Sequence, residues 1–113
     1  MTSRLIPRTR LLGALALGLL APLSVAHAEG AWAHAHPRRD QVIDRTQNLN
    51  RRIRHERREG KLSPAEARAL HAQVRDTRME QRDMANANGG YITKSQQAGL
   101  NQQENAISRK IGQ

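Results

Sequence analysis

Two stretches of the chain carry the same helix-start signal: Leu62-Ser63-Pro64-Ala65-Glu66 and Ile92-Thr93-Lys94-Ser95-Gln96. In each, a Ser or Thr hydroxyl can cap the first turn. A Glu or Gln three residues later can accept a hydrogen bond from the backbone of that cap. Pro64 takes the first helical position, where its missing N–H is harmless. Gly60 and Gly90 stand just before the two starts and suit the ends of preceding helices. These signals predict an all-α fold.

The two starts belong to a longer internal repeat with an offset of 30 residues. Each copy contains a glycine that ends one helix, an apolar residue just before the cap, and a boxed start of the next helix. Leu62 could pack on Ala67 as a hydrophobic staple. The matching pairs are Gly60/Gly90, Leu62/Ile92, Ser63/Thr93, Glu66/Gln96, Leu70/Leu100 and Gln73/Gln103. We therefore expect two similar αα-corners.

Apolar spacing outward from the repeat predicts three helices. Val42, Leu49 and Ile53 fall on one narrow helical stripe, with Asp40 as a candidate N-cap. The expected helices span residues 40–58, 64–87 and 94–110. Short Gly-containing turns of about four residues favour antiparallel neighbours, and hence a three-helix bundle or a pair of helical hairpins.

The apolar side chains are few for a domain of this size. Those in the predicted helical region are Val42, Ile43, Leu49, Ile53, Leu62, Leu70, Val74, Met79, Met84, Ile92, Leu100, Ile107 and Ile111. Such a core is thin, and small domains are marginally stable even with fuller cores. We therefore expect a homodimer or an extended helical assembly to cover Leu49, Ile53, Leu70, Val74, Leu100 and Ile107.

The N-terminal region has the pattern of an export signal. Arg4, Arg8 and Arg10 precede an apolar run at residues 11–21, and Ala26-His27-Ala28 supplies the small residues that a signal peptidase requires. The apolar run is shorter than the roughly 20 residues that a transmembrane helix needs. The predicted organisation is a signal peptide at 1–28, a flexible tail at 29–39 and a helical domain at 40–113. The predicted location is the periplasm.

The charge of the chain is strongly positive. Nineteen Lys and Arg against ten Asp and Glu give a formal net charge of +9, and +6 remains without the three signal-peptide arginines. We do not expect nucleic acid as the partner, because the compartment holds little of it and the aromatic residues are only Trp32 and Tyr91. Protein clients, an envelope protein or an anionic membrane surface fit the charge better.

The repeat also carries a family resemblance. Leu62-Ser63-Pro64-Ala65-Glu66 and Ile92-Thr93-Lys94-Ser95-Gln96 resemble the Leu-Thr-x-x-Gln motif, which occurs twice in the small periplasmic Spy/CpxP proteins and the related ZraP proteins. The resemblance implies an all-helical envelope-stress protein and, for Spy itself, an ATP-independent chaperone that cradles unfolded clients as an antiparallel dimer. Neither copy reads the motif in full. Apolar–Ser/Thr–x–x–Glu/Gln is also what any well-capped helix start requires.

The resemblance and the charge together favour a chaperone-like binding protein. Its partner surface is expected to consist of arginines that flank the apolar stripe, because their long stems can cover apolar surface while their heads attract acidic groups. These residues are Arg51, Arg52, Arg58, Arg75, Arg78 and Arg82. The alternative is a structural or regulatory protein that docks one dedicated envelope partner.

Metal binding and catalysis have weaker signals. His34 and His36 could hold Cu(II), Ni(II) or Zn(II), especially if cleavage after Ala33 placed His36 third from a free amine. The repeat also fits the second half of an EF-hand loop, but His55 and Arg57 stand where calcium needs oxygen ligands. No Cys, nucleophile elbow or phosphate loop is present. We therefore expect a non-enzyme without a cofactor.

Export leads to the first testable prediction. Cleavage after Ala28 should give a mature protein of residues 29–113 by intact mass spectrometry of the periplasmic fraction. A mature N-terminus at His34 would contradict this site and favour the copper hypothesis. A full-length protein in the cytoplasm would contradict export itself.

Overall fold

The structure is a computed structural model that describes residues 30–112. The chain divides into two compact units between Ala35 and His36. In the first unit, residues 30–35 are helical. The predicted signal peptide and its cleavage site after Ala28 lie outside the described residues.

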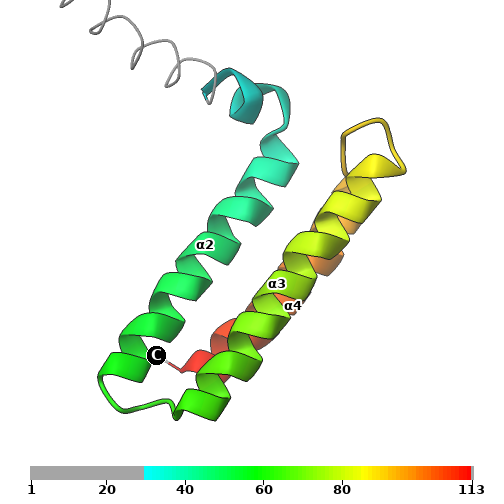
Figure 1. Ribbon diagram of the computed structural model, residues 1–113. Helices are drawn as coiled ribbons and strands as arrows, with labels where there is room; N and C mark the ends of the chain where they lie inside the picture. Colours follow the sequence, from blue (N-terminus) through cyan, green and yellow to red (C-terminus); the bar gives the residue numbers. More distant parts are fainter. Residues whose placement is uncertain (1–29, 113) are drawn as a thin grey trace, which may run out of the picture. The chain divides into compact units, whose positions relative to one another are not determined.

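The second unit is an up-down-up bundle of three helices within its described residues 36–112 (Figure 1). The helices are α2 (Pro37–Arg58), α3 (Pro64–Asn86) and α4 (Lys94–Ile111), and each packs against the other two. The all-α prediction is confirmed, and the ends predicted for α3 and α4 are within one residue of those observed. No helix within residues 30–112 has the length and apolar character needed to cross a bilayer.

Both helix starts form the capping boxes that the sequence predicts. The Ser63 hydroxyl accepts a hydrogen bond from the Glu66 N–H at 3.0 Å, and the Glu66 carboxylate accepts one from the Ser63 N–H at 2.8 Å. These bonds to Ser63 hold the pKa of Glu66 below its usual value. Thr93 and Gln96 repeat the arrangement at 3.1 and 2.8 Å. Each box satisfies N–H groups that a helix start otherwise leaves without partners.

The helix ends follow the repeat less closely than the helix starts. At the end of α2, Gly60 has φ +77°, the Lys61 N–H donates to the Glu56 carbonyl at 2.9 Å, and the Gly60 N–H donates to the Arg57 carbonyl at 3.1 Å. This is a Schellman motif. The second connection, residues 87–93, is longer than the first, residues 59–63, and contains two positive-φ glycines, Gly89 and Gly90. The offset of 30 therefore holds for the helix starts and for Gly60 and Gly90, whereas α2 and α3 end at Arg58 and Asn86.

The N-terminal boundary of the bundle differs from the prediction. α2 begins at Pro37 with His36 as its N-cap, and the Asp40 N–H already donates to the His36 carbonyl at 2.9 Å. Asp40 therefore lies inside the first turn and is not the N-cap. Pro37 fixes the start because proline favours the first helical position and pushes the preceding residue out of the helical conformation.

The described part of the predicted tail at 29–39 is helical, and the boundary predicted at residue 40 is wrong. Residues 30–35 are helical, and Pro37–Arg39 belong to α2. The first of these segments is rich in alanine, the residue with the highest helix propensity. The compact helical unit begins at His36 and not at residue 40.

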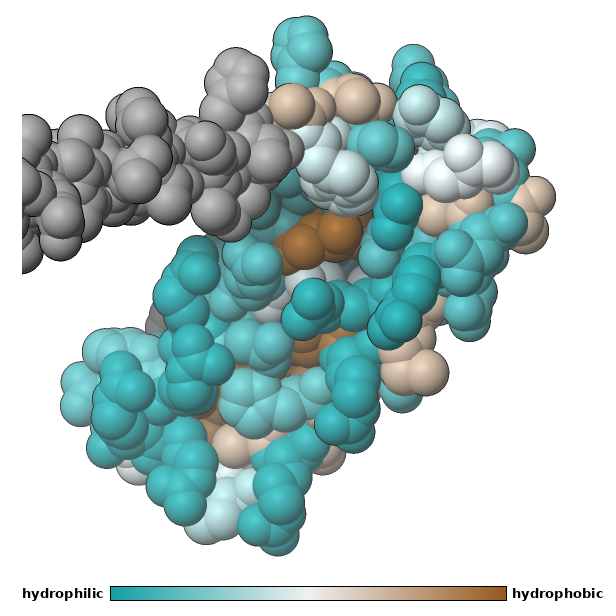
Figure 2. Space-filling model, turned by 45° about the horizontal axis from the view of Figure 1, so that its top comes forward, coloured by the Kyte–Doolittle hydropathy of each residue, from teal (hydrophilic) through white to brown (hydrophobic). Residues whose placement is uncertain are grey.

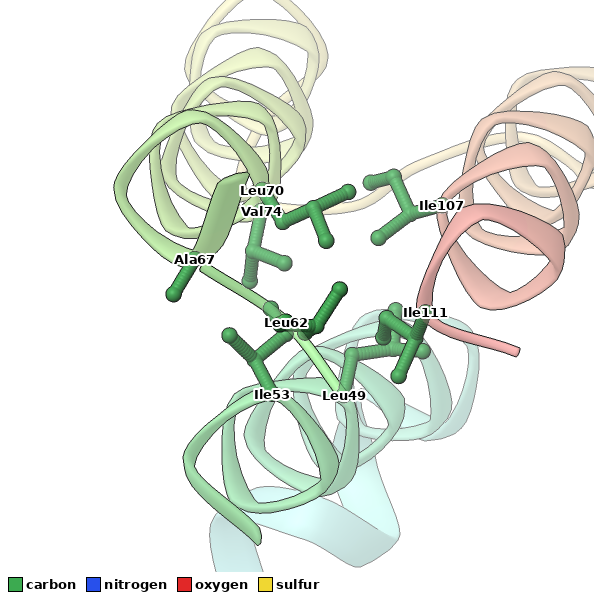
Figure 3. Packing of buried hydrophobic residues seen from close by; sticks show 8 residues of the cluster. All are labelled: Leu49, Ile53, Leu62, Ala67, Leu70, Val74, Ile107 and Ile111. Atoms are coloured by element: carbon green, nitrogen blue, oxygen red, sulfur yellow. The ribbon is translucent and has the colours of Figure 1, made fainter. Parts of the chain in front are cut away.

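The core consists of two apolar clusters. The larger one lies towards the end of the bundle where α2 turns into α3, and Figure 3 shows its side chains pointing between the three helices. It contains Leu49, Ile53, Leu62, Ala67, Leu70, Val74, Ile107 and Ile111. The smaller one lies towards the other end and contains Val42, Ala85, Ile92 and Leu100, with Met84 against it. Leu62 and Ala67 share a cluster, as the staple requires.

The thin core is covered within one chain. The six side chains expected to need a partner, Leu49, Ile53, Leu70, Val74, Leu100 and Ile107, are each at most 5% exposed. These side chains therefore do not need a second chain to cover them, because the three narrow stripes face one axis and cover one another. Met79 lies outside this core and is 48% exposed.

A polar layer separates the two clusters. Thr46 of α2, Thr77 and Gln81 of α3 and Glu104 of α4 are all buried, and each stands in sequence between residues of the two clusters. The Thr46 hydroxyl donates to the Ile43 carbonyl at 2.6 Å. The Thr77 hydroxyl lies 3.1 Å from its own helix backbone and 3.2 Å from a glutamine of α4. Neither hydroxyl donates to Glu104.

Glu104 is the most unusual residue of the core. Its side chain is fully buried, and neither carboxyl oxygen has a hydrogen-bond partner among the described residues. Its ion-pair partner, Arg45, lies 3.9 Å away and is partly exposed. Burial raises the pKa of Glu104 to about 7, and the positive charge of Arg45 only partly offsets that rise.

The buried carboxyl makes stability depend on pH. The pKa of Glu104 rises from 4.5 to about 7 on folding. The stabilisation that Glu104 contributes is therefore fully present below pH 4.5 and is lost as the pH rises towards 7. Above pH 7 it does not change further. We expect Glu104→Gln, which is neutral throughout, to remove this fall and to be more stable above pH 7 by about 3 kcal/mol.

Urea unfolding of both proteins across this pH range measures the effect. The exposed Asp76 serves as the control, because Asp76→Asn removes a carboxylate that is not buried. Parallel stability curves for Glu104→Gln and the unmodified protein would contradict the expectation.

Candidate functional site

Side-chain hydrogen bonds close the contact between α2 and α4. Arg45 donates to the Asn105 side chain, and Arg52 donates to the Ser108 hydroxyl at 2.7 Å and to the Gly112 carbonyl at 2.6 Å. Both arginines come from the flank of α2 that faces α4. Their guanidinium groups therefore link α2 to the α4 region by hydrogen bonds.

Side-chain hydrogen bonds also close the contact between α3 and α4. Lys110 donates to Gln73 at 3.1 Å, and Gln103 donates to Glu80 at 2.9 Å. Thr77 lies 3.2 Å from the Gln103 side chain. The flank of α3 that carries Gln73 and Glu80 therefore faces α4.

The surface along the contact between α2 and α3 is hollowed. Two hollows of about 520 and 420 Å³ lie along it, and His71 borders both, so they adjoin. Eight arginines of the described residues border them: Arg39, Arg54, Arg57, Arg58, Arg68, Arg75, Arg78 and Arg82. No aspartate or glutamate among residues 30–112 borders either hollow. We call this surface the basic groove.

The lining of the basic groove includes a few apolar residues. Met79, Pro64 and Ala67 contribute to its lining, and Met79 is half exposed. Figure 2 shows separate patches of brown, apolar surface among teal, hydrophilic side chains on one face of the molecule. A groove with this surface offers both apolar contact and positive charge.

One wall of the basic groove follows a regular spacing on α3. Arg68, His71, Arg75, Arg78 and Arg82 recur at intervals of three and four residues, which places them on one face of the helix. Each stands one position after a residue of the buried stripe, which runs Ala67, Leu70, Val74, Thr77 and Gln81. The arginine row therefore borders the core directly.

The arginines that α3 contributes to the groove form no ion pair within the described part of the chain. Its ion pairs involve Arg45, His55 and Lys61, and the groove arginines of α3 take part in none of them. Like charges three or four residues apart destabilise a helix by about 0.2–0.5 kcal/mol per pair. The arrangement therefore carries a cost for folding, which a role in binding would explain.

Two side chains of the groove, Arg39 and His71, make three polar contacts. Arg39 donates to Gln81 at 3.0 Å and to the Gly90 carbonyl at 3.0 Å. The His71 Nδ1 atom lies 2.7 Å from the Asn50 side-chain oxygen. Partial burial, with a further contribution from Arg54, lowers the pKa of His71, so its neutral form dominates at neutral pH.

The structure brings together four of the six arginines predicted to contact a partner. Arg58, Arg75, Arg78 and Arg82 border the basic groove. Arg51 is exposed and borders neither hollow, whereas Arg52 is held by α4. The sequence analysis missed Arg39, Arg54, Arg57 and Arg68. The three-four spacing would have found Arg68, but the positions on α2 depend on which flank faces α3.

The residues of the repeated motif have structural roles in the bundle. Ser63, Glu66, Thr93 and Gln96 form the two capping boxes. Leu62 and Ile92 are buried, one in each apolar cluster. Gly60 and Gly90 supply positive φ angles at the turns. These roles account for the motif without a ligand.

The two candidate metal ligands belong to different units. The His36 ring stacks on Tyr91 with centroids 4.8 Å apart, and His34 is exposed in the other unit. Within residues 30–112 no group of three or more metal-binding side chains is found. Comparisons of the chain with protein-family models, curated proteins and solved structures gave no match.

The different positions of Arg51 and Arg52 can be tested directly. We expect Arg52→Ala to lower stability by about 1–3 kcal/mol, because it removes charge-assisted hydrogen bonds to α4. Arg51→Ala should change stability by less than about 0.5 kcal/mol, as is usual for an exposed residue. Urea unfolding measures both values. Equal effects would contradict the structural role of Arg52.

Proposed function

We propose that the protein is an exported, non-enzymatic binding protein of the cell envelope that holds acidic segments of unfolded or partly folded proteins. The observation that carries this proposal is the basic groove, which eight arginines and a few apolar residues line without an acidic residue from the described part of the chain. Unfolded segments expose both apolar side chains and charges, so one surface can engage both.

Arginine suits this role physically. Its stem packs on apolar surface, its guanidinium group is weakly hydrated, and its fork of donors matches a carboxylate. Exposed charges at the rim attract an acidic client over a distance that shrinks with salt, from about 10 Å at 0.1 M ionic strength. Binding of this kind is broad, fast and salt-sensitive.

Two features of the sequence support the envelope setting. The pattern of residues 1–28 is that of an export signal. The two helix starts are similar to the repeated motif of the Spy/CpxP proteins, which implies envelope stress as the setting. The groove adds a surface on which clients of such a protein would bind.

The test is aggregation of chemically unfolded clients in the presence of the protein. We expect protection of acidic clients at low salt, weaker protection of basic clients, and loss of protection as salt rises. Arg75→Gln/Arg78→Gln should lose most of the protection, because both side chains border the groove and are exposed.

The matched control is Lys94→Gln/Arg109→Gln, which removes the same charge at exposed positions of α4 away from the groove. It should protect clients as the unmodified protein does. Equal loss of protection in both variants would show that the net charge of the protein alone accounts for the effect. No protection of any client at stoichiometric excess in low salt would overturn the proposal and favour one dedicated envelope partner.

A further inference from the structure

The basic groove contains one side chain whose charge can change near neutral pH. His71 of α3 is partly buried and borders both hollows, so it lies where they adjoin. The arginines around it stay charged, because a guanidinium group does not lose its proton in proteins. Histidine, in contrast, changes its charge between about pH 5 and pH 8. Protonation of His71 therefore changes the charge at the junction of the two hollows.

Asn50 of α2 fixes which nitrogen of the His71 ring carries the proton. The His71 Nδ1 atom lies 2.7 Å from the Asn50 side-chain oxygen, and an amide oxygen only accepts hydrogen bonds. Nδ1 is therefore the donor, and the lone pair of the neutral ring is on Nε2. Nε2 makes no hydrogen bond to residues 30–112 and is not enclosed by them. It is the ring atom that a ligand can reach.

The charges around His71 come from both helices that line the groove. α2 contributes one set of arginines and α3 another, and none of the acidic residues at 30–112 borders either hollow. The set on α2 is Arg39, Arg54, Arg57 and Arg58, and the set on α3 is Arg68, Arg75, Arg78 and Arg82. In the free protein, partial burial and then the charge of Arg54 lower the pKa of His71. The ring is therefore neutral at neutral pH.

An acidic ligand reverses these conditions. Its carboxylates pair with the arginines and offset the repulsion that opposes a proton on the ring. A carboxylate at Nε2 meets a lone pair when the ring is neutral, and it meets a charged N–H donor when the ring is protonated. The pKa of His71 is therefore higher in the complex than in the free protein.

From this geometry we infer that His71 makes the basic groove sensitive to pH, so that the groove holds acidic segments more tightly in acidic surroundings. The ring takes up a proton as the ligand binds, and Nε2 then donates a hydrogen bond to a ligand carboxylate. Asn50 is a positioning residue, because it holds Nδ1 and leaves Nε2 for the ligand. The inference rests on the proposed function and adds the regulation of the same site.

Proton uptake fixes the direction of the pH dependence. The complex, with the higher pKa, binds more protons than the free protein, so affinity rises as the pH falls. The gain is fully present below the pKa of His71 in the free protein and is lost as the pH rises through its pKa in the complex. A pKa that is higher by one in the complex corresponds to an affinity gain of about tenfold.

Titration of the protein into a rhodamine-labelled acidic peptide at constant low salt measures the effect. The peptide carries aspartates between leucines and serines, because aspartate stays largely ionised above about pH 5. We expect binding to be about tenfold tighter at about pH 5 than at about pH 7.5. Calorimetry between these values, in two buffers of different ionisation enthalpy, should show uptake of protons on binding.

Three variants assign the pH dependence to one residue. His71→Gln should lose both the change in affinity and the proton uptake, because glutamine does not titrate. His55→Gln is the matched control, because His55 is an exposed histidine of α2 that borders neither hollow. Glu104→Gln removes the buried carboxyl, which borders neither hollow. Both of these variants should keep the change in affinity with pH.

The role of Asn50 has a spectroscopic readout. The nitrogen-15 chemical shifts of the His71 ring identify the protonated nitrogen, and they should show Nδ1–H in the free protein at neutral pH. Asn50→Ala should allow the Nε2–H form as well and change these shifts. An Nε2–H ring in the unmodified protein would overturn the inference.

The outcomes separate this inference from the proposed function. Equal affinity at both pH values, with clients still protected, would overturn the pH sensitivity and leave the proposed function in place. A pH dependence that persists in His71→Gln would overturn the assignment to His71. No binding of the peptide at either pH, together with no client protection, would overturn both proposals.

Discussion

The structure depends on the narrowness of the apolar stripe on each helix. Each stripe is only wide enough to meet the other two at the bundle axis, and together they leave the core side chains nearly inaccessible. The flanking positions on every helix are therefore polar. Because three helices form three contacts, the chemistry of these flanks decides what lines each contact. Hydrogen bonds cross all three of them, and arginines line the hollows along the contact between α2 and α3.

The sequence predicted those features that depend on neighbouring residues. The starts at Ser63 and Thr93 were correct because a capping box lies within four residues of sequence. The start of α2 was wrong because an acidic residue inside a first turn resembles a cap, while Pro37 and His36 set the boundary. The cover of the core was misjudged as well. Counting apolar residues says nothing about how three stripes face one another.

The features that involve two helices were less predictable. Glutamate is usually found at the surface. Only its position between Leu100 and Ile107 on α4 places Glu104 in the core. Four of the predicted arginines do border the groove, but Arg52 faces α4 because it lies on the other flank of the α2 stripe. The row on α3 was visible in the sequence. Its position in a groove could not be predicted without knowing that α2 lies across from it and contributes arginines of its own.

The polar layer has a consequence for the internal motions of the bundle. It divides the core into one large apolar cluster near the α2–α3 turn and a smaller one near the α3–α4 turn. Local opening takes less free energy where fewer apolar contacts must be broken. Backbone amides at the end that holds Val42, Ala85 and Leu100 therefore exchange with solvent through smaller fluctuations than those around Leu49 and Val74. The half of the bundle near the α2–α3 turn therefore opens less readily than the half near the α3–α4 turn.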